Sequence, residues 1–335
     1  MAQQSTTPSI GRGLIPAAAT VIVLIGMHFA ASVVVLLVFS SLVTLLLVPL
    51  QERLLARGMR TSVALLICLA VYVAVLAIAA VIVLFGMADF INNLPTYRSS
   101  LEVAVDKMTG PSEVVTQLFG IVADAAQAFI ATVGSGVVVI GYSVIVVAYM
   151  LLEARRGRER ILWAARGNQE VLDRAEEAGK RMAAFVVART VLGLVAAVIE
   201  TILLIVLGVP SALLWGVLSF LMSFVPNIGF IVALIPPAIL ALAVLGPWYA
   251  VAVVVGYSLV NFAVDYVMQP RYIGSSVNMS ALVVTLSIVF WTIVLGPAGA
   301  LLAVPLTIAT IAIADAFPDS RPVARLLVDD VGAAD

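Results

Sequence analysis

The sequence predicts an all-α integral membrane protein, and three observations support this fold class. The 335 residues are 63% hydrophobic and 11% charged, whereas a soluble domain has about 25% charged residues. The mean hydropathy is +1.18. Stretches long enough to cross a bilayer carry no Asp, Glu, Lys or Arg: 13–51, 61–88, 125–152, 201–264 and 272–314. These features exclude an ordinary soluble enzyme, a disordered chain and a disulfide scaffold.

The charge-free stretches are expected to be helices. A bilayer core of about 30 Å needs about 20 helical residues, and without water each pass must satisfy its own backbone hydrogen bonds. The first stretch holds two passes, joined near 26–28, and the last two hold more than one helix each. The expected helices are 14–28, 31–50, 62–86, 134–152, 187–208, 211–225, 229–245, 248–268, 281–295 and 299–314. Arg12 before an apolar run is typical of a signal peptide, but a second apolar run follows at once, so we expect an uncleaved first helix.

Two pairs of short helices are each interrupted by a cluster of residues that break helices. Pro lacks the amide hydrogen and Gly favours bends, so Pro226, Gly296, Pro297 and Gly299 are expected to act as hinges. Each pair is either two full passes or a hairpin that enters the membrane and returns. As hairpins they have opposite orientations, their tips meet near the midplane, and the chain has about eight membrane elements. Broken helices at that depth need surrounding protein or water, as in transporters.

The distribution of Lys and Arg predicts the sides of the membrane. Segment 51–61 carries three and 153–189 carries nine, against two in 87–133. Because basic residues collect on the cytoplasmic side, both termini are predicted to be cytoplasmic and 87–133 extracytoplasmic. The resulting regions are N-terminal membrane helices 1–86, an extracytoplasmic amphipathic segment 87–133, a membrane helix 134–152, a basic cytoplasmic helical segment 153–186, a membrane transport core 187–314 and a cytoplasmic tail 315–335.

The two polar segments are expected to be helical. Segment 87–133 has two amphipathic stretches separated by breaks at Pro95 and Gly110-Pro111, and it serves either as a cap or as a subunit or gating contact. Segment 153–189 carries an apolar stripe that suits packing against another helix, including one of a neighbouring subunit. Acidic residues dilute its basic charge, which disfavours nucleic-acid binding. The stripe consists of Val171, Ala175, Ala178, Met182 and Phe185.

No catalytic constellation is visible. There is no phosphate-binding loop with Gly-Lys-Ser/Thr, and the single histidine and the single cysteine, His28 and Cys68, make a metal site and an internal disulfide implausible. His28 is expected at a helix–helix turn and Cys68 in the packing of a helix. The sequence therefore predicts a protein that is not an enzyme and that needs neither a metal nor a cofactor.

Polar residues inside apolar helices remain as candidates for function. A charge near the bilayer centre costs at least about 2.5–3.5 kcal/mol, so it needs a partner or water. Glu200 is either structural or a site of proton or cation coupling. Asp265, with Asn261 four residues earlier on the same face, either pairs with Arg271 at the end of its helix or takes part in transport.

The first broken pair offers hydrogen-bonding groups for a substrate. Asn227 is either a turn amide that bonds its own backbone or an amide that faces substrate. Ser219 and Ser223 precede it with a spacing of four residues, and Gly229 completes the turn. We name Asn227, Gly229, Ser223 and Asn261 as candidate substrate-binding residues, and Asp265 and Glu200 as candidate coupling residues.

The C-terminal half resembles the autoinducer-2 exporter family of transporters. The similarity lies in two blocks in the same order and spacing. The first spans 207–242 and includes Val225-Pro226-Asn227-Ile228-Gly229. The second includes Gln269-Pro270-Arg271-Tyr272-Ile273-Gly274 and Gly296-Pro297-Ala298-Gly299. Departures from the family pattern are Ala281, Phe230 and an Asp rather than a Glu at Asp265.

The resemblance implies a multi-pass, oligomeric transporter of about eight helices, but it does not specify the substrate. We expect export of a small polar solute such as autoinducer-2, the molecule for which the family is named. Two alternatives stay open: a monovalent cation (Na⁺)/proton antiporter that uses the same carboxylates, and a membrane scaffold that transports nothing. The expected partners are therefore a small molecule or ion, the lipid bilayer and further copies of the chain.

Overall fold

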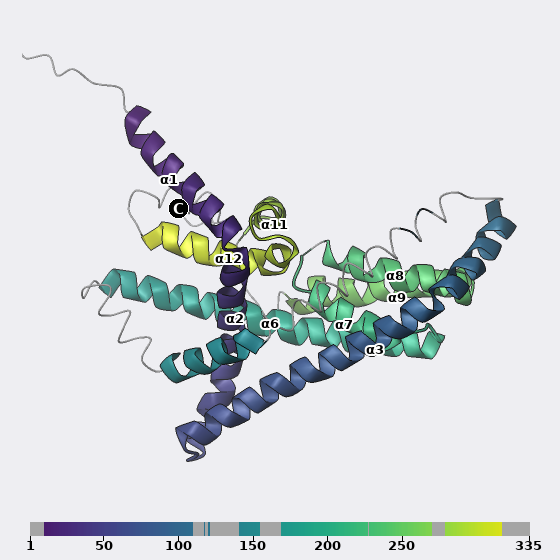
Figure 1. Cartoon of the computed structure of the whole chain (residues 1–335), viewed down its shortest axis with the longest axis horizontal. Coiled ribbons are helices and arrows are strands. Elements are labelled where there is room, and N and C mark those ends of the chain that lie inside the picture. Colours follow the sequence, from purple (N-terminus) through teal and green to yellow (C-terminus); the bar gives the residue numbers. More distant parts are fainter. Residues whose placement is uncertain are drawn as a thin grey trace, which may run out of the picture.

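The computed structural model describes residues 10–109, 117, 120, 141–154, 169–226, 228–269 and 279–316. These residues are helical, with no strand among them, and five of the helical stretches are long and apolar enough to cross a membrane. The predicted all-α membrane fold is therefore confirmed. The helices are α1 (Ile10–Phe29), α2 (Ala31–Ala56), α3 (Thr61–Thr109), Gly141–Glu153, α6 (Gln169–Leu207), α7 (Ala212–Met222), α8 (Gly229–Val244), α9 (Pro247–Phe262), the π-helix η2 (Ala263–Met268), α11 (Ala281–Leu295) and α12 (Pro297–Ala316) (Figure 1).

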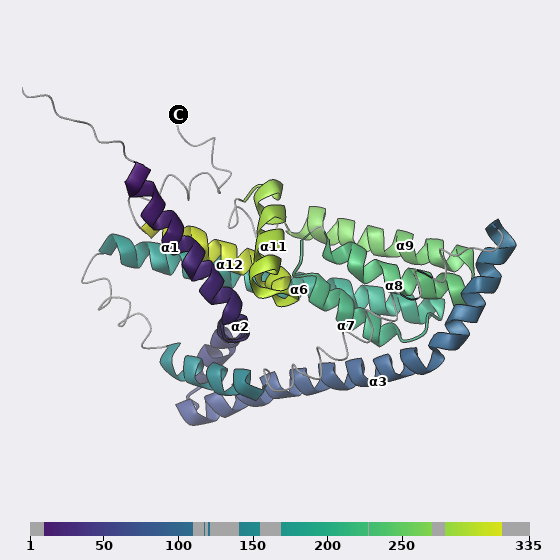
Figure 2. The ribbon, with the colours of Figure 1, turned by 45° about the horizontal axis from the view of Figure 1, so that its top comes forward.

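Helix α3 is longer than expected. It continues through the predicted boundary at 86/87, and Pro95 lies inside it, so the predicted break at Pro95 is wrong. A proline removes one backbone hydrogen bond and bends a helix without always ending it, and Figure 2 shows α3 bending around the ends of α8 and α9. Its buried residues Phe90, Tyr97 and Leu101 pack against the α7–α9 bundle, which holds the segment in place.

The predicted cytoplasmic helix and the membrane helix after it form one helix. Helix α6 runs without a break from Gln169 to Leu207, so the boundary at 186/187 is a change of polarity rather than the end of a helix. Phe185 is buried against residues of α11 and α12, and Met182 packs beside it. The apolar stripe therefore contacts a helix of the same chain; the side chains of Val171 and Ala175 lie outside the described residues.

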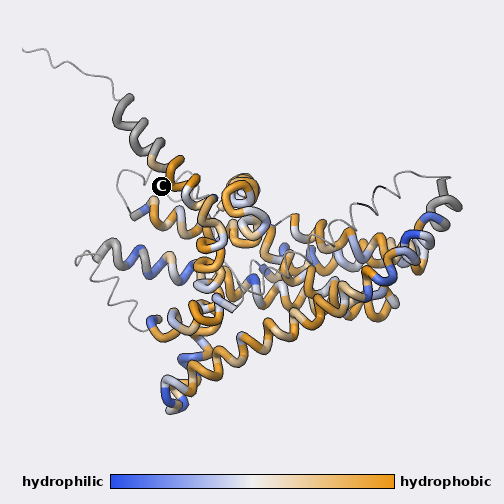
Figure 3. Tube along the Cα trace, viewed as in Figure 1, coloured by the Kyte–Doolittle hydropathy of each residue, from blue (hydrophilic) through white to orange (hydrophobic). Residues whose placement is uncertain are grey.

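Hydrophilic residues gather toward two opposite ends of the molecule. Figure 3 shows them at the start of α6 and at the α2–α3 turn on one side, and along the C-terminal part of α3 on the other. The end of α12 lies with the first group, because Arg174 Nη1 contacts Asp315 Oδ2 at 2.7 Å. The two segments predicted to be cytoplasmic thus share one end, and the segment predicted to be extracytoplasmic lies at the other.

Both broken helical pairs turn at the predicted breaks, but α12 is long and apolar enough to cross a membrane, so the choice between two full passes and a re-entrant hairpin stays a prediction. Helix α7 has only 11 residues, about 16 Å at 1.5 Å per residue, which is too short to cross a bilayer. The chain turns after Met222 and returns as α8, which begins at Gly229. The second turn is tighter, since Gly296 adopts φ 71° and Pro297 begins α12 directly.

The turns of the two hairpins contribute to one buried cluster, together with residues of α2 and α6. Val225, in the turn between α7 and α8, belongs to the same buried cluster as Val294 and Leu295, which precede the turn between α11 and α12. All three side chains are at most 7% exposed. The predicted hinge residues Pro226 and Gly296 are therefore chain neighbours of residues in this shared cluster.

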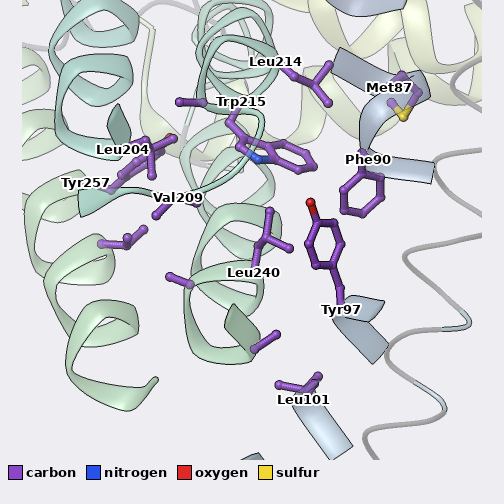
Figure 4. Close-up of a cluster of buried hydrophobic side chains, with 14 of the residues drawn as sticks. Met87, Phe90, Tyr97, Leu101, Leu204, Val209, Leu214, Trp215, Leu240 and Tyr257 are labelled. Carbon is purple, nitrogen blue, oxygen red and sulfur yellow. The ribbon is translucent and has the colours of Figure 1, made fainter. Parts of the chain in front are cut away.

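A second core surrounds the α7–α8 hairpin (Figure 4). Phe90 of α3 packs edge-to-face on Trp215 of α7, with ring centroids 5.3 Å apart, and Trp215 Nε1 donates to the carbonyl of Pro210 at 3.1 Å. Leu240 of α8 and Tyr257 of α9 complete the cluster. This core fixes the start of α7, the end of the hairpin that lies away from its turn. Helix α7 is thereby held beside α6.

Two glycines allow the hairpins to close, and we expect Gly299→Ala to be destabilising. A Cβ at Gly299 overlaps the carbonyl of Trp291, and a Cβ at Gly229 overlaps the carbonyl of Met222. Backbone atoms cannot rotate away as side chains do, so the cost is expected to be about 1–3 kcal/mol. The measurement is thermal unfolding of the purified protein in detergent.

The matched control is Gly179→Ala, in an exposed part of α6 where a Cβ meets open space. That change should be neutral or slightly stabilising, since Ala is favoured over Gly in a helix. Equal melting temperatures for the two variants would contradict the packing described for the second hairpin.

Candidate functional site

A buried carboxylate lies at the junction of α6, α7 and α9. Glu200, on α6, is 2% exposed. The amide of Asn261, on α9, donates from Nδ2 to Glu200 Oε1 at 2.7 Å and also to the carbonyl of Tyr257 at 2.9 Å. Asn261 therefore links the carboxylate to the backbone of α9 and fixes its position.

Two buried hydroxyl groups lie near this carboxylate. Ser219 of α7 is 6% exposed and Tyr257 of α9 is fully buried. Ser219 Oγ lies within reach of the Glu200 carboxylate and of the Tyr257 hydroxyl, although neither contact has the geometry of a well-formed hydrogen bond. Glu200 forms no salt bridge with a described residue. The side chains of Glu200, Ser219 and Tyr257 thus bring oxygen atoms from α6, α7 and α9 into one buried cluster.

Small residues bring these helices together. A Cβ at Gly216 of α7 would overlap the hydroxyl of Thr201 on α6. At Gly193 of α6 it would overlap the hydroxyl of Ser223, and at Gly256 of α9 it would overlap Leu203. Glycine at each position lets the backbones approach closely, as in other membrane helix contacts. The Glu200 cluster is the polar part of this close contact.

A second polar pair lies nearer the start of α6. Arg189 Nη1 donates to Asp265 Oδ1 at 3.0 Å. The Arg189 side chain is 7% exposed and the Asp265 side chain is 39% exposed. Asp265 lies in the π-helix η2; π-helical turns occur mostly as single turns within α-helices and often at functional sites. The described partner of Asp265 is therefore a residue of α6, whereas the predicted partner, Arg271, lies outside the described residues.

The unequal burial of this ion pair leads to a prediction. Asp265→Asn leaves the guanidinium of Arg189, which is 7% exposed, without its counter-charge, whereas Arg189→Met leaves a carboxylate that is 39% exposed and therefore less enclosed by protein. We expect Asp265→Asn to lower the free energy of unfolding by about 1–3 kcal/mol, and Arg189→Met to lower it less. Thermal unfolding of both variants and of the double variant tests this, and a larger loss for Arg189→Met would contradict it.

An apolar layer separates the two polar groups. Leu192 and Ala196 of α6 and Val264 of η2 form a small buried cluster, with Val260 and Met268 packed against it. It occupies the part of the α6–α9 contact between Arg189 and Glu200. The predicted coupling residues are therefore not in one site: Glu200 is joined to Asn261, and Asp265 to Arg189.

The other predicted site residues have structural contacts. Ser223 Oγ donates to the carbonyl of Phe220 at 2.7 Å, and Gly229 is buried against the carbonyl of Met222. Pro226 lies in the turn between α7 and α8. Asn227 lies outside the described residues, so its interpretation as an amide that faces substrate stays a prediction.

The site includes residues that the sequence did not single out. Tyr257 was not singled out because an aromatic residue in an apolar helix usually packs in a core, and Arg189 because it was counted only as a cytoplasmic charge. Tyr257 is four residues before Asn261, and this spacing places both on one helix face. No group of three or more His, Cys, Asp or Glu side chains among the described residues could hold a metal ion.

The two single-copy residues pack as expected. His28 Nδ1 lies 2.9 Å from the carbonyl of Val294, which joins the end of α1 to the tip of the second hairpin. Cys68 is buried in a cluster of α2, α3 and the helix Gly141–Glu153.

Comparison with known proteins indicates a transport family over nearly the whole chain. Residues 18–319 match the model of the AI-2E family transporter. The AI-2 transport protein TqsA of Escherichia coli is 27% identical over 332 residues, which cover 92% of this chain and 93% of that protein. The putative transport protein YhhT of Escherichia coli is 28% identical over 305 residues, covering 88% and 87%. A putative transport protein of Haemophilus influenzae is 28% identical over 338 residues, covering 96% and 97%.

Proposed function

The chain belongs to the AI-2E transporter family, and from this premise we propose that it is a secondary transporter of the cytoplasmic membrane that exports a small polar solute such as autoinducer-2. Family membership and the apolar helices make it a multi-pass membrane protein with a role in transport. The solute is suggested by the name of the relative TqsA, an AI-2 transport protein. Export and the choice of solute are the proposal.

The buried cluster shared by the turns of the two hairpins carries this proposal. Val225 lies in one buried cluster with Val294 and Leu295, so two helix-breaking turns from distant parts of the sequence border the same core. Non-helical backbone at membrane depth occurs where it is enclosed by protein or lines a path for substrate. Movement of one hairpin against the other would open that path alternately to each side. A water-filled pocket at Asn227 stays a prediction.

The distribution of polar residues supports the proposed orientation. The basic start of α6, the α2–α3 turn and the end of α12 lie toward one end (Figure 3), which we assign to the cytoplasm by the excess of Lys and Arg. In this orientation both termini are cytoplasmic and the C-terminal part of α3 is extracytoplasmic. The α7–α8 hairpin then enters from outside, and the α11–α12 hairpin enters from inside.

The Glu200 cluster favours coupling of transport to an ion or proton. A carboxylate that is 2% exposed and has no salt bridge with a described residue is costly in a membrane helix, and such residues mark ion and proton pathways in transporters. The same observation supports the alternative function, a monovalent cation (Na⁺)/proton antiporter. The two functions differ in whether a solute moves with the ion.

Transport by purified protein in liposomes tests the proposal. Liposomes loaded with autoinducer-2 should release it in a saturable way when the protein and an ion gradient are present. Cation-dependent proton flux without solute release would favour the antiporter. If loaded liposomes with the protein release the solute no faster than loaded liposomes without protein, and no ion flux is seen, the scaffold is favoured. Oligomeric assembly stays a prediction, which the mass of the detergent-solubilised protein tests.

A further inference from the structure

We propose that one face of α9 and η2 lies directly against lipid, with Trp248 at one interface of the bilayer and Tyr266 at the other. The proposal names a surface that the bilayer covers and the depth at which that surface lies. It goes beyond the proposed function, because it requires only that the chain lies in a membrane. This surface, called the α9 face below, consists of Trp248, Val251, Val255, Leu259, Phe262 and Tyr266.

The residues of the α9 face lie on one side of the helix. They follow one another at intervals of three or four residues, which keeps side chains on one side of a helix. All six are exposed, whereas Val253 and Tyr257, on the opposite side, are fully buried. The rings of Phe262 and Tyr266 stack with centroids 5.1 Å apart, so the face continues into the π-helix. A continuous exposed apolar surface of this kind marks a site of interaction.

The length of the α9 face matches the apolar core of a bilayer. Tyr266 follows Trp248 by 18 positions, which correspond to about 27 Å at 1.5 Å per residue, close to the core thickness of about 30 Å. Trp and Tyr are enriched at both interfaces of a membrane, where their rings lie at the level of the headgroups. Trp248 is 83% exposed and Tyr266 is 73% exposed. The α9 face is therefore an apolar band with an amphipathic aromatic residue at each edge.

Charged residues on α6 mark the same level as Tyr266. Asp265, next to Tyr266, forms the ion pair with Arg189 of α6 at 3.0 Å. Charged residues occur on α6 up to Arg189, whereas 190–207 carries only Glu200. Because a charge within the bilayer core is costly, we expect the ion pair at the edge of that core. Two helices thus place this edge at the same level.

The opposite edge is marked in a similar way. The two helices are antiparallel, since Leu203, near the end of α6, lies against Gly256 in the middle of α9 rather than against η2. The end of α6 therefore lies toward the start of α9, which carries Trp248. Shortly after that end, Ser211 Oγ donates to Asp89 Oδ2 at 2.9 Å, and Asp89 is the first charged residue of α3 after the charge-free stretch 61–88. Polar contacts thus occur at both edges of the α9 face.

The chemistry of the α9 face fits fluid acyl chains better than a second copy of the chain. Contacts between membrane helices favour small residues, which let backbones approach, and Gly256 serves this purpose toward α6. The α9 face has no small residue, since its side chains are branched or aromatic. The exposed hydroxyl of Ser258, beside this face, donates to the carbonyl of Val254 at 2.7 Å, so it needs no partner from water.

This placement sets the depth of the polar residues of α6. Arg189 and Asp265 lie at the edge of the apolar core, on the side that we assign to the cytoplasm. Glu200 follows Arg189 by 11 positions, about 16 Å along the helix. It therefore lies near the middle of a core of about 30 Å.

Spin labels on single cysteines test what covers the α9 face. The cysteines replace Trp248, Val255, Leu259 and Tyr266, one at a time, in a Cys68→Ala background, and the protein is reconstituted in liposomes. Labels at Val255 and Leu259 should collide freely with oxygen, which dissolves in lipid. They should collide at least about tenfold less often than an exposed control label with a water-soluble nickel chelate, since a polar compound enters an apolar medium only at high cost. Labels at Trp248 and Tyr266 should give intermediate values.

The control label replaces Glu102, an exposed side chain on the polar part of α3, which the nickel chelate should reach freely. Infrequent collisions with both oxygen and nickel at Val255 and Leu259 would mean that a second copy covers the face. Frequent collisions with nickel there would mean that water covers it, and either result overturns the proposal.

A second measurement decides if a labelled protein does not fold. The fluorescence of the wild type minus that of Trp248→Phe reports on Trp248 alone, and lipids that carry bromine near the headgroup should quench it more strongly than lipids that carry bromine near the chain ends. Equal or weaker quenching by bromine near the headgroup overturns the proposal. Neither measurement involves solute flux, so a failure here leaves the proposed function to its own test.

Discussion

Glu200→Gln is expected to abolish ion-driven transport while leaving the protein folded. The carboxylate is 2% exposed on α6 and is held by Asn261 at 2.7 Å. A glutamine has nearly the same shape and still accepts that hydrogen bond through its oxygen, but it can neither bind a proton nor balance a cation. Neutralising the charge also removes the cost of burying it, so stability should not fall.

The measurement separates coupling from movement of the solute. In liposomes with autoinducer-2 and an ion gradient, the variant should not drive the solute against its concentration gradient, whereas exchange of labelled for unlabelled solute should continue. Glu102→Gln serves as the matched control, because it makes the same chemical change on an exposed part of α3. Wild-type accumulation by the Glu200 variant would show that coupling uses another group, of which Asp265 is the next candidate.

The fold could be predicted well from the sequence because the membrane restricts the choices. A long charge-free stretch must form helices, so the expected helix 281–295 coincides with α11, and 229–245 differs from α8 by one residue. The predictions were less accurate where polar and apolar parts belong to one helix. The sequence changes polarity near 86 and near 186, but α3 continues through the first position and α6 through the second. A helix satisfies its own backbone hydrogen bonds, so it can pass from lipid into water without ending.

The site could be predicted only in part because depth in the membrane does not specify a helix face. Glu200, Asn261 and Asp265 were identified as polar residues in apolar surroundings, and their chemistry alone placed them among the candidates. Their partners depend on how α6, α7 and α9 pack, which is decided by distant residues such as Gly216 and Gly256. The spacing of four residues between Asn261 and Asp265 was therefore misleading, since each contacts a different residue of α6.

Covalent linkage of the two hairpin tips is expected to stop transport. Val225 and Leu295 belong to one buried cluster and are each at most 7% exposed. A dry, packed cluster between the two turns excludes a polar solute, so we expect the tips to separate during each transport cycle. The test places cysteines at Val225 and Leu295 in a Cys68→Ala background and treats liposomes with a short, reducible thiol cross-linker. Transport should fall to the level of liposomes without protein, and it should return when the cross-linker is reduced.

A cross-link within one hairpin is the control for this experiment. Ile288 of α11 and Val304 of α12 are buried in the same cluster, on opposite arms of the second hairpin and eight residues either side of Gly296. Linking them should leave transport unchanged if the hairpin moves as one body. Loss of transport in both linked proteins would mean that the hairpin deforms internally. Full transport with linked tips, verified by mass spectrometry of the joined peptides, would place the solute path elsewhere in the molecule, because a path between the tips requires them to part.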